Sequence, residues 1–383
     1  MFPLPDEEGH QIMKLVCSVG DLLGVVNKVW ETTDIKKAAI ASNIYLKGIH
    51  KANDSWLYVY ATDYSIQCLT KVEVDLDEDF EIAVSPEDLV RGIQSLNQET
   101  EITLSKPDIN SQLLVKAGKV KYKVSCLANI SFHKLAMKAL PTLNDPGLVL
   151  AQSVLKSGIK SVLFAVSANP GMYGVMRSIE IKGNESTIKF SASDGKVAAV
   201  SELKCGPLDK EFSINIGKDD INTLIRLINL NPAGEMEIYP EGIYFKFPDT
   251  LLVFSKLSGK LPDLKAIINK YPIATSCNID KKLLLETAKR TSLFTDSRES
   301  AINISCNKDG LKFEANEFEE DVTGSFSKDK VAKIDKDYLL NCIQSCSGKT
   351  IELCFTDNKV LIIKDLYKEE KVDSTTQYVI MGQ

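Results

Sequence analysis

The chain has 383 residues, of which 44% are hydrophobic and 26% charged, a balance typical of folded domains rather than of disordered chains. Its length allows two or three domains, and its net charge of −6 argues against a surface that is basic throughout. No apolar run approaches the roughly 20 residues of a membrane helix, and the first residues lack a signal-peptide pattern, so the expected compartment is the cytoplasm.

Cysteine and histidine usage argues against several kinds of chemistry. The nine cysteines are odd in number and form no Cys-x-x-Cys pair, which disfavours a disulfide framework and a zinc module. Cys342 and Cys346 lie four apart in a predicted helix without a nearby histidine, so we expect two core thiols. The histidines, His10, His50 and His133, are scattered, and glycine-rich phosphate loops are absent. We expect no enzyme activity, no metal and no cofactor.

Six helices are predicted in chain order. Each combines apolar residues at helical spacing with a polar face, and most carry acids in the first turn, where they offset the helix dipole. In the first helix Leu22, Val25, Val26 and Val29 share one face. The predicted helices cover residues 21–30, 84–94, 153–164, 216–226, 280–294 and 334–344.

Short alternating runs bounded by Gly, Asn or Asp turns fill the intervals between these helices, and this pattern is typical of antiparallel strands. Each third of the chain then holds two helices and about eight strands. The predicted strands cover residues 43–47, 56–60, 101–104, 113–115, 121–124, 179–181, 187–190, 237–239, 243–247, 251–254, 302–304, 311–313 and 360–363.

One strand ending recurs three times and reveals a repeat. Strand-like segments end in Ala61-Thr62-Asp63, Ala192-Ser193-Asp194 and Ala315-Asn316-Glu317, with 131 and then 123 positions between the acids. A period above 100 residues is long enough for each repeat to have its own core. Because the three acids would lie in separate domains, we interpret them as turn residues rather than as a metal cluster.

The similar segments Leu140-Pro141-Thr142-Leu143 and Leu261-Pro262-Asp263-Leu264 are interpreted as connections between repeats. They predict three similar α+β domains, at residues 1–145, 146–272 and 273–383. The first of these includes about a dozen residues before Met13 that form a short N-terminal extension.

Charge is unevenly distributed over the predicted helices. Beyond their first turns, the helix bodies carry seven basic residues against the single acid Glu286. A shared positive face of this kind could follow a polyphosphate backbone without sequence preference, whereas the alternative is a set of solvated helix faces. The seven residues are Lys28, Arg91, Lys156, Lys160, Arg226, Lys289 and Arg290.

Along nearly its whole length the sequence resembles the bacterial-type DNA polymerase III β subunit, the replicative sliding clamp. The resemblance rests on the order and spacing of several segments together with the threefold repeat. Those segments are Phe190-Ser191-Ala192-Ser193-Asp194-Gly195-Lys196-Val197-Ala198-Ala199-Val200, Phe254-Ser255-Lys256-Leu257, Leu261-Pro262-Asp263-Leu264 and the ending Tyr378-Val379-Ile380-Met381.

The resemblance implies that each chain is half of a six-domain ring, a head-to-tail homodimer that encircles double-stranded DNA. The ring would hold the replicative polymerase on DNA for processive synthesis, and the seven basic residues would face the DNA. The alternatives are a clamp-fold accessory or structural repeat protein that does not encircle DNA, a nuclease with clustered carboxylates, and the two-domain trimeric clamp of archaea and eukaryotes, which three repeats per chain disfavour.

The resemblance also implies a pocket between the second and third domains, where the polymerase, the clamp loader and other partners insert a short apolar peptide. Val197 and Ala266 stand where the family usually has basic residues, Ala198 replaces a larger aliphatic one, and the end at Gly382-Gln383 lacks the family's usual tail. The implied pocket residues are Val175, Ser193, Gly195, Lys196, Val197, Ala198, Pro262, Ala266, Ile267, Val360, Tyr378, Val379, Ile380 and Met381.

Overall fold

The structure, a computed structural model, describes residues 13–30, 32–33, 41–51, 54–106, 112–127, 147–169, 171–172, 174–231, 234–240, 243–257, 259–296, 300–369 and 372–382. The predicted N-terminal extension and the predicted connection Leu140–Leu143 lie outside these residues. The chain divides into two compact units, residues 1–147 with 223–255 and residues 148–222 with 256–383. Because the predicted middle domain contributes to both units, the three domain boundaries stay a prediction.

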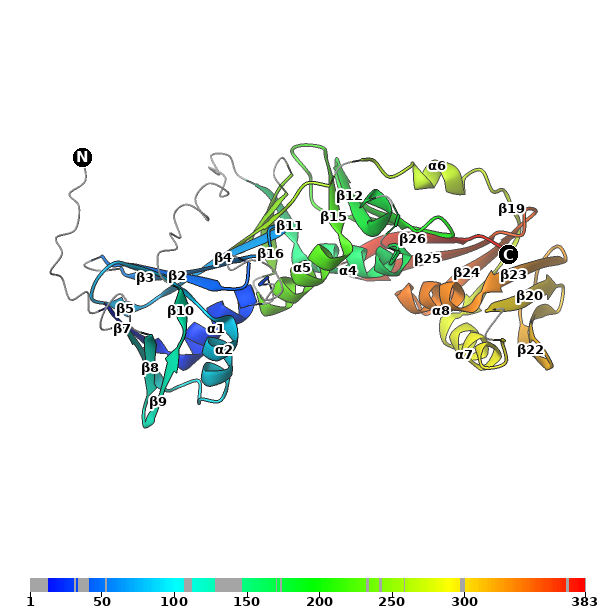
Figure 1. Cartoon of the computed structure of the whole chain (residues 1–383). Helices are drawn as coiled ribbons and strands as arrows, with labels where there is room; N and C mark the ends of the chain where they lie inside the picture. Colours follow the sequence, from blue (N-terminus) through cyan, green and yellow to red (C-terminus); the bar gives the residue numbers. More distant parts are fainter. Residues whose placement is uncertain are drawn as a thin grey trace. The chain divides into compact units, whose positions relative to one another are not determined.

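In the first unit, two antiparallel sheets accompany helices α1 (Val19–Trp30) and α2 (Pro86–Gln94) (Figure 1). The smaller sheet contains β1 (Met13–Ser18), β5 (Asp75–Leu76), β7 (Glu101–Lys106), β8 (Leu113–Ala117) and β9 (Val120–Val124), in the order β5-β1-β7-β8-β9. The larger sheet contains β2 (Ile44–Ile49), β3 (Trp56–Thr62), β4 (Ile66–Glu73), β6 (Phe80–Val84), β10 (Cys126–Leu127), β16 (Glu235–Tyr239), β17 (Tyr244–Lys246) and β18 (Thr250–Phe254), in the order β10-β6-β2-β3-β4-β18-β17-β16.

In the second unit, helices α4 (Gln152–Val162), α6 (Leu264–Ile268), α7 (Lys281–Ser292) and α8 (Lys336–Ser345) accompany β11 (Leu148–Ala151) and two further sheets. One sheet contains β12 (Ser178–Asn184), β13 (Thr187–Ser193), β14 (Val197–Lys204), β15 (Phe212–Gly217), β19 (Ile273–Asp280), β24 (Thr350–Thr356), β25 (Leu361–Glu369) and β26 (Val372–Ile380), in the order β15-β12-β13-β14-β26-β25-β24-β19. The other contains β20 (Ala301–Asn307), β21 (Gly310–Ala315), β22 (Phe318–Thr323) and β23 (Lys330–Asp335), in the order β22-β21-β20-β23.

Helix α5 (Lys218–Leu230) spans the division between the two units. Two short 3₁₀ segments, Leu163–Ala165 and Gly174–Arg177, complete the regular structure of the second unit.

All six predicted helices are confirmed, with ends shifted by a few residues, because amphipathic spacing and acidic caps are local signals. The carboxylate of Asp280 accepts from Leu283 N–H at 2.8 Å, and that of Asp335 accepts from Asp337 N–H at 2.9 Å. The apolar face of the first helix, Leu22 to Val29, is buried in α1. The sequence missed the short helix α6, together with β1, β4, β5, β6, β10, β11, β14, β15, β19, β22, β23, β24 and β26.

The repeat is visible in how sheets continue from one repeat into the next. In the first unit β4 pairs with β18, with Ile66 opposite Phe254. In the second unit β14 pairs with β26, with Val197 opposite Ile380. Each strand pair lies within its own sheet, and the two pairs use an equivalent register, so the two joints are built alike. The second joint forms the floor of the candidate site.

Candidate functional site

The predicted partner site centres on the turn that connects β13 and β14. Asp194 Oδ1 accepts from the backbone N–H groups of Lys196 and Val197, both at 2.9 Å. The Ser193 hydroxyl donates to the carbonyl of Val197 at 2.8 Å and accepts from Gly195 N–H at 3.1 Å. Gly195 has φ +92°, a conformation that L side chains rarely adopt, so glycine suits this position. The turn is therefore fixed by its own side chains.

This arrangement confirms the interpretation of the repeated acids as turn residues. In the first repeat Asp63 Oδ1 accepts from the N–H groups of Ser65 at 2.8 Å and Ile66 at 2.7 Å, as Asp194 does in the second. Glu317 lies in the turn between β21 and β22. Carboxylates that accept from successive N–H groups stabilise tight turns between strands.

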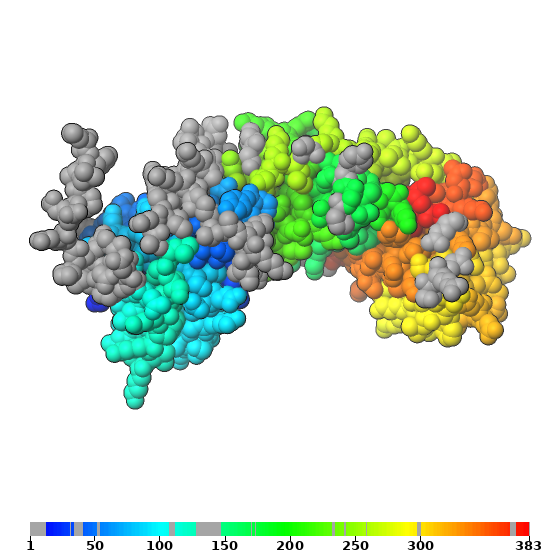
Figure 2. Space-filling view, in the orientation of Figure 1, coloured from blue at the N-terminus to red at the C-terminus, as the bar shows by residue number. Residues whose placement is uncertain are grey.

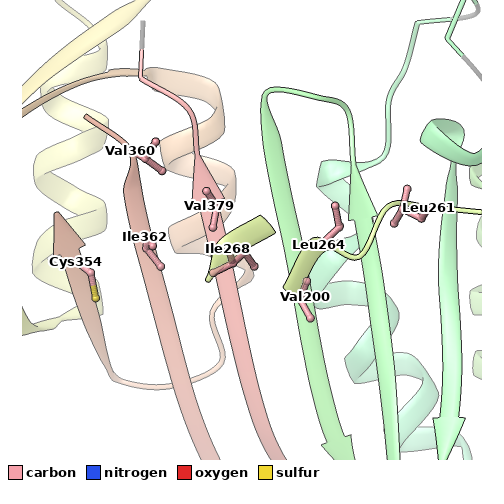
Figure 3. Close-up of a cluster of buried hydrophobic side chains, with 8 residues drawn as sticks. All are labelled: Val200, Leu261, Leu264, Ile268, Cys354, Val360, Ile362 and Val379. Carbon is pink, nitrogen blue, oxygen red and sulfur yellow. The ribbon is translucent and has the colours of Figure 1, made fainter. Parts of the chain in front are cut away.

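Helix α6 lies over the joint between β14 and β26 and covers an apolar cluster, which Figure 3 shows. The Asp263 carboxylate caps α6 by accepting from Ala266 N–H at 3.3 Å, and Lys265 pairs with Glu202 of β14 at 2.9 Å. Met176, Ala198, Ile267 and Tyr271 pack against the cluster and stay partly accessible. The buried members are Val200, Leu261, Leu264, Ile268, Cys354, Val360, Ile362 and Val379.

The structure brings the predicted pocket residues of the turn, α6 and β26 into this one region of the second unit. Met381 N–H donates to the carbonyl of Lys196 at 3.0 Å and ties the end of β26 to the turn. Accessible or partly accessible residues are Val175, Gly195, Lys196, Ala198, Pro262, Ala266, Ile267 and Met381. Buried ones are Ser193, Val197, Val360, Tyr378, Val379 and Ile380.

Strand alternation separates the residues of β26 between two faces of the sheet. Val379 joins the cluster under α6, whereas its neighbour Tyr378 contacts Phe164, with 5.6 Å between the ring centroids. Burial raises the pKa of Tyr378 well above its usual value. Tyr378 therefore supports the sheet from the face opposite α6, and a peptide lying on the α6 side would meet Val379 rather than Tyr378.

Sequence reasoning missed several residues at this site. Met176 and Tyr271 contact the apolar cluster, and Tyr338 of α8 donates to Asp194 Oδ2 at 2.5 Å. In a single sequence, a methionine or tyrosine in a helix or loop looks the same whether it belongs to a binding site or to the core. The only sequence signal for Tyr338 was its place in the first turn of a predicted helix whose counterparts carry acids there.

Two of the seven predicted DNA-facing residues form long-range contacts inside the first unit. Lys28 is 9% exposed, and its ammonium group pairs with Asp249 at 2.6 Å. Arg226 donates to the carbonyls of Asn27 at 2.6 Å and Lys28 at 3.1 Å, at the C-terminal end of α1 where a cation is favourable. Both side chains thus hold the first unit together.

The remaining predicted basic residues are more open. Arg91 is 77% exposed and pairs with Glu87 at 3.3 Å. Arg290 is exposed but binds Glu320 through two nitrogens, and those hydrogen bonds lower the pKa of Glu320. Lys156 is half-buried in α4. Lys160 and Lys289 are exposed in the last turns of α4 and α7, and neither forms an ion pair with a described residue.

All nine cysteines are free thiols, and Cys342 and Cys346 are buried as predicted. Within the described ranges, no group of three or more His, Cys, Asp or Glu side chains is placed to hold a metal ion. No described helix combines the length and apolar character required to cross a membrane.

Comparisons with known proteins agree with this architecture. A family model described as "DNA polymerase III beta subunit, C-terminal domain" matches residues 273–382. The beta sliding clamp of Synechocystis sp. is 22% identical over 320 residues, which covers 78% of this chain and 79% of that protein. The beta sliding clamp of Caulobacter vibrioides is 20% identical over 389 residues, which covers 96% of this chain and 99% of that protein.

Solved structures define the fold class. The DNA polymerase III subunit beta of Pseudomonas aeruginosa superposes with a TM-score of 0.83 at 21% sequence identity. The beta subunit of Thermotoga maritima superposes with a TM-score of 0.84 at 15% identity. Each superposition covers 97% of this chain and 99% of the other chain. The chain therefore has the α+β fold of three tandem DNA-clamp domains, as predicted. The family model over residues 273–382, the relatives of matching length and this fold all indicate similarity to the bacterial DNA polymerase III β subunits, the sliding clamps.

Proposed function

We propose that two of these chains join head to tail into a closed ring around duplex DNA and hold the replicative polymerase there. The repeat of sheet joints carries this proposal. Strands β4 and β14 pair with β18 and β26, the third strand after the second helix of the next repeat. By the same rule, β22 of one chain would pair with β9 of a second chain. In the described part of the chain, β9 and β22 each lie at the end of the strand order of their sheet.

The charges on the two open strands support pairing between chains. β9 has the sequence Val-Lys-Tyr-Lys-Val, in which Lys121 and Lys123 are exposed. β22 has the sequence Phe-Glu-Glu-Asp-Val-Thr, in which Glu319 and Asp321 are exposed. An acidic edge in each chain would meet a basic edge in the other, which favours the heterologous contact and disfavours pairing of like edges.

Apolar surface lies beside both open strands. Phe318 of β22 stacks on Phe294 with 4.5 Å between ring centroids, and the adjacent Leu293 is 80% exposed. On the other edge Val120 is 45% exposed, and the hairpin of β8 and β9 projects from the first unit (Figures 1 and 2). Burial of these side chains would add a hydrophobic contribution to the paired strands.

Light scattering at micromolar concentration tests the ring, and the expected mass is twice 42.3 kDa. The double variant Lys121→Glu/Lys123→Glu should reduce the mass to that of one chain because both edges become acidic. Adding Glu319→Lys/Asp321→Lys to the same chain should restore the dimer. A charge-reversed variant that remains fully dimeric would contradict the proposed edge pairing.

A closed ring holds DNA by topology, so its DNA contacts need only be weak and independent of sequence. Among the seven basic helix residues, we assign the DNA-facing role to the accessible ones, above all to Arg91, Lys160 and Lys289, and a structural role to Lys28 and Arg226. Protein loaded on closed circular DNA should stay bound at salt concentrations that release it once the circle is cut. Equal loss from circular and linear DNA would contradict encirclement.

The site under α6 is the proposed docking place for partners such as the replicative polymerase and the clamp loader. Its accessible apolar side chains, including Ala198, Ile267 and Met381, suit a short peptide with leucine or phenylalanine anchors. The proposed role is non-catalytic and cytoplasmic. Fluorescence anisotropy with a labelled pentapeptide ending in Leu-Phe tests it, with alanine at both positions as the control peptide; equal binding of both peptides would contradict an apolar pocket.

A further inference from the structure

We infer that Tyr338 is a positioning residue for the partner site: its hydroxyl holds the Asp194 turn in the conformation that accepts a peptide. This inference rests on the proposed docking function of the site. It concerns a side chain of α8 that acts on the peptide through Asp194, and not a wall of the pocket.

The geometry divides the two oxygens of Asp194 between two tasks. Oδ1 accepts from Lys196 and Val197 N–H and so shapes the turn, whereas Oδ2 accepts from the Tyr338 hydroxyl at 2.5 Å. A short hydrogen bond to an ionised acceptor is among the stronger kinds in proteins. The turn is therefore tied to the third repeat by a side chain as well as by the backbone bond from Met381 to Lys196.

Tyr338 is itself held firmly. Its backbone N–H donates to the Asp335 carboxylate that caps α8, at 3.3 Å, so the side chain emerges from a capped first turn. Burial, and then the hydrogen bond to Asp194, raise the pKa of the Tyr338 hydroxyl. The hydroxyl thus remains protonated and able to donate throughout the neutral range.

The three repeats differ at this helix position. The first turns of the second helices read Pro86-Glu87-Asp88, Lys218-Asp219-Asp220 and Lys336-Asp337-Tyr338. An ionised aspartate cannot donate to another carboxylate, whereas a phenol can. Only the third repeat therefore carries a donor at this position, and it is the repeat that faces the turn of the candidate partner site.

Tyr338→Phe tests the inference because it removes one hydroxyl and keeps the ring. We expect the labelled pentapeptide ending in Leu-Phe to bind this variant about tenfold more weakly, which corresponds to roughly the net value of one such hydrogen bond. The matched control is Tyr239→Phe, which removes an equally short phenol–carboxylate bond, from Tyr239 to Glu237 at 2.5 Å, in the other compact unit. Its peptide affinity should equal that of the wild type.

A double-mutant cycle separates positioning from general damage. Asp194→Ala removes the acceptor of the Tyr338 hydroxyl together with the turn bonds at Oδ1. If the bond matters as a pair, Tyr338→Phe should cost little further affinity in the Asp194→Ala background. Fully additive losses, or an unchanged affinity of Tyr338→Phe, would overturn the inference.

The outcomes also distinguish this inference from the proposed function. If the wild-type chain does not bind the Leu-Phe peptide, the docking function fails and the positioning role fails with it. If the wild type binds and Tyr338→Phe binds equally well, only the positioning role fails. Weakened binding by both Tyr338→Phe and Tyr239→Phe would also overturn it, because the loss would then not depend on the Asp194 turn.

Discussion

Lys28 offers the sharpest test of how the basic helix residues divide between stability and DNA contact. The sequence predicted a DNA-facing lysine, yet the side chain is 11% exposed and pairs with an Asp249 side chain that is 40% exposed. In the variant Lys28→Ala the Asp249 carboxylate loses its cation, and the packing of the lysine stem is lost as well. Both effects destabilise the first unit.

The magnitude follows from the exposure of the two partners. Breaking a fully buried pair costs about 3–5 kcal/mol, and breaking an exposed one roughly 0.2–1 kcal/mol. One partner is buried here, while the other reaches solvent and keeps a hydrogen bond from the Thr250 hydroxyl. We expect a loss of about 2 kcal/mol, or roughly 4–8 °C in the melting temperature of a unit of this size.

The assay is a thermal melt of Lys28→Ala beside Lys160→Ala, paired with the salt dependence of DNA association for both. Lys160 is exposed and forms no ion pair with a described residue. The free energy of unfolding of Lys160→Ala should therefore lie within about 0.5 kcal/mol of the wild-type value. The same variant should associate more weakly with DNA. The reasoning would be refuted by a Lys28→Ala chain that melts like the wild type and loses DNA association as Lys160→Ala does.

Three further outcomes follow from the structure. In Gly158→Ala the new methyl group would lie 2.1 Å from the ring of Phe190, so we expect a loss of about 1–3 kcal/mol in a thermal melt. In Gly195→Ala the residue must adopt φ +92°, so we expect a loss of roughly 1–2 kcal/mol and weaker binding of the Leu-Phe peptide. Arg290 lowers the pKa of Glu320, so the stability that their contact contributes is present above the ordinary carboxyl pKa and should be lost as pH falls through the lowered value. The difference in melting temperature between the wild type and Glu320→Gln should therefore be largest near neutral pH and disappear in acid.

Two of these outcomes have an internal control. Gly24 also lies inside a helix, but a methyl group there would meet nothing within 4 Å, so Gly24→Ala should stabilise by about 0.5–1 kcal/mol. Equal effects at Gly158 and Gly24 would contradict the close helix–strand contact. For the acid-dependent contact, Glu319→Gln serves as the comparison because Glu319 pairs with Lys312 rather than with Arg290.

The sequence by itself determined the repeating parts of this protein. Apolar residues at helical spacing and acidic first turns predicted all six long helices, because these signals depend on neighbours within a few residues. Asp63 and Asp194 were identified as turn residues for the same reason, since an aspartate accepts from the N–H groups two and three positions later. The period of these local signals predicted three α+β repeats.

Only the tertiary structure decided what those residues contact across the fold. The sequence could not show that Lys28 meets Asp249, 221 positions away, or that Tyr338 meets Asp194, 144 positions away. Nor could it separate Val379, which packs under α6, from Tyr378 on the opposite face, until the pairing of β26 with β14 set the register. Whether a basic or aromatic side chain serves stability or binding depends on such long-range contacts. These contacts produce no periodic pattern in the amino-acid sequence.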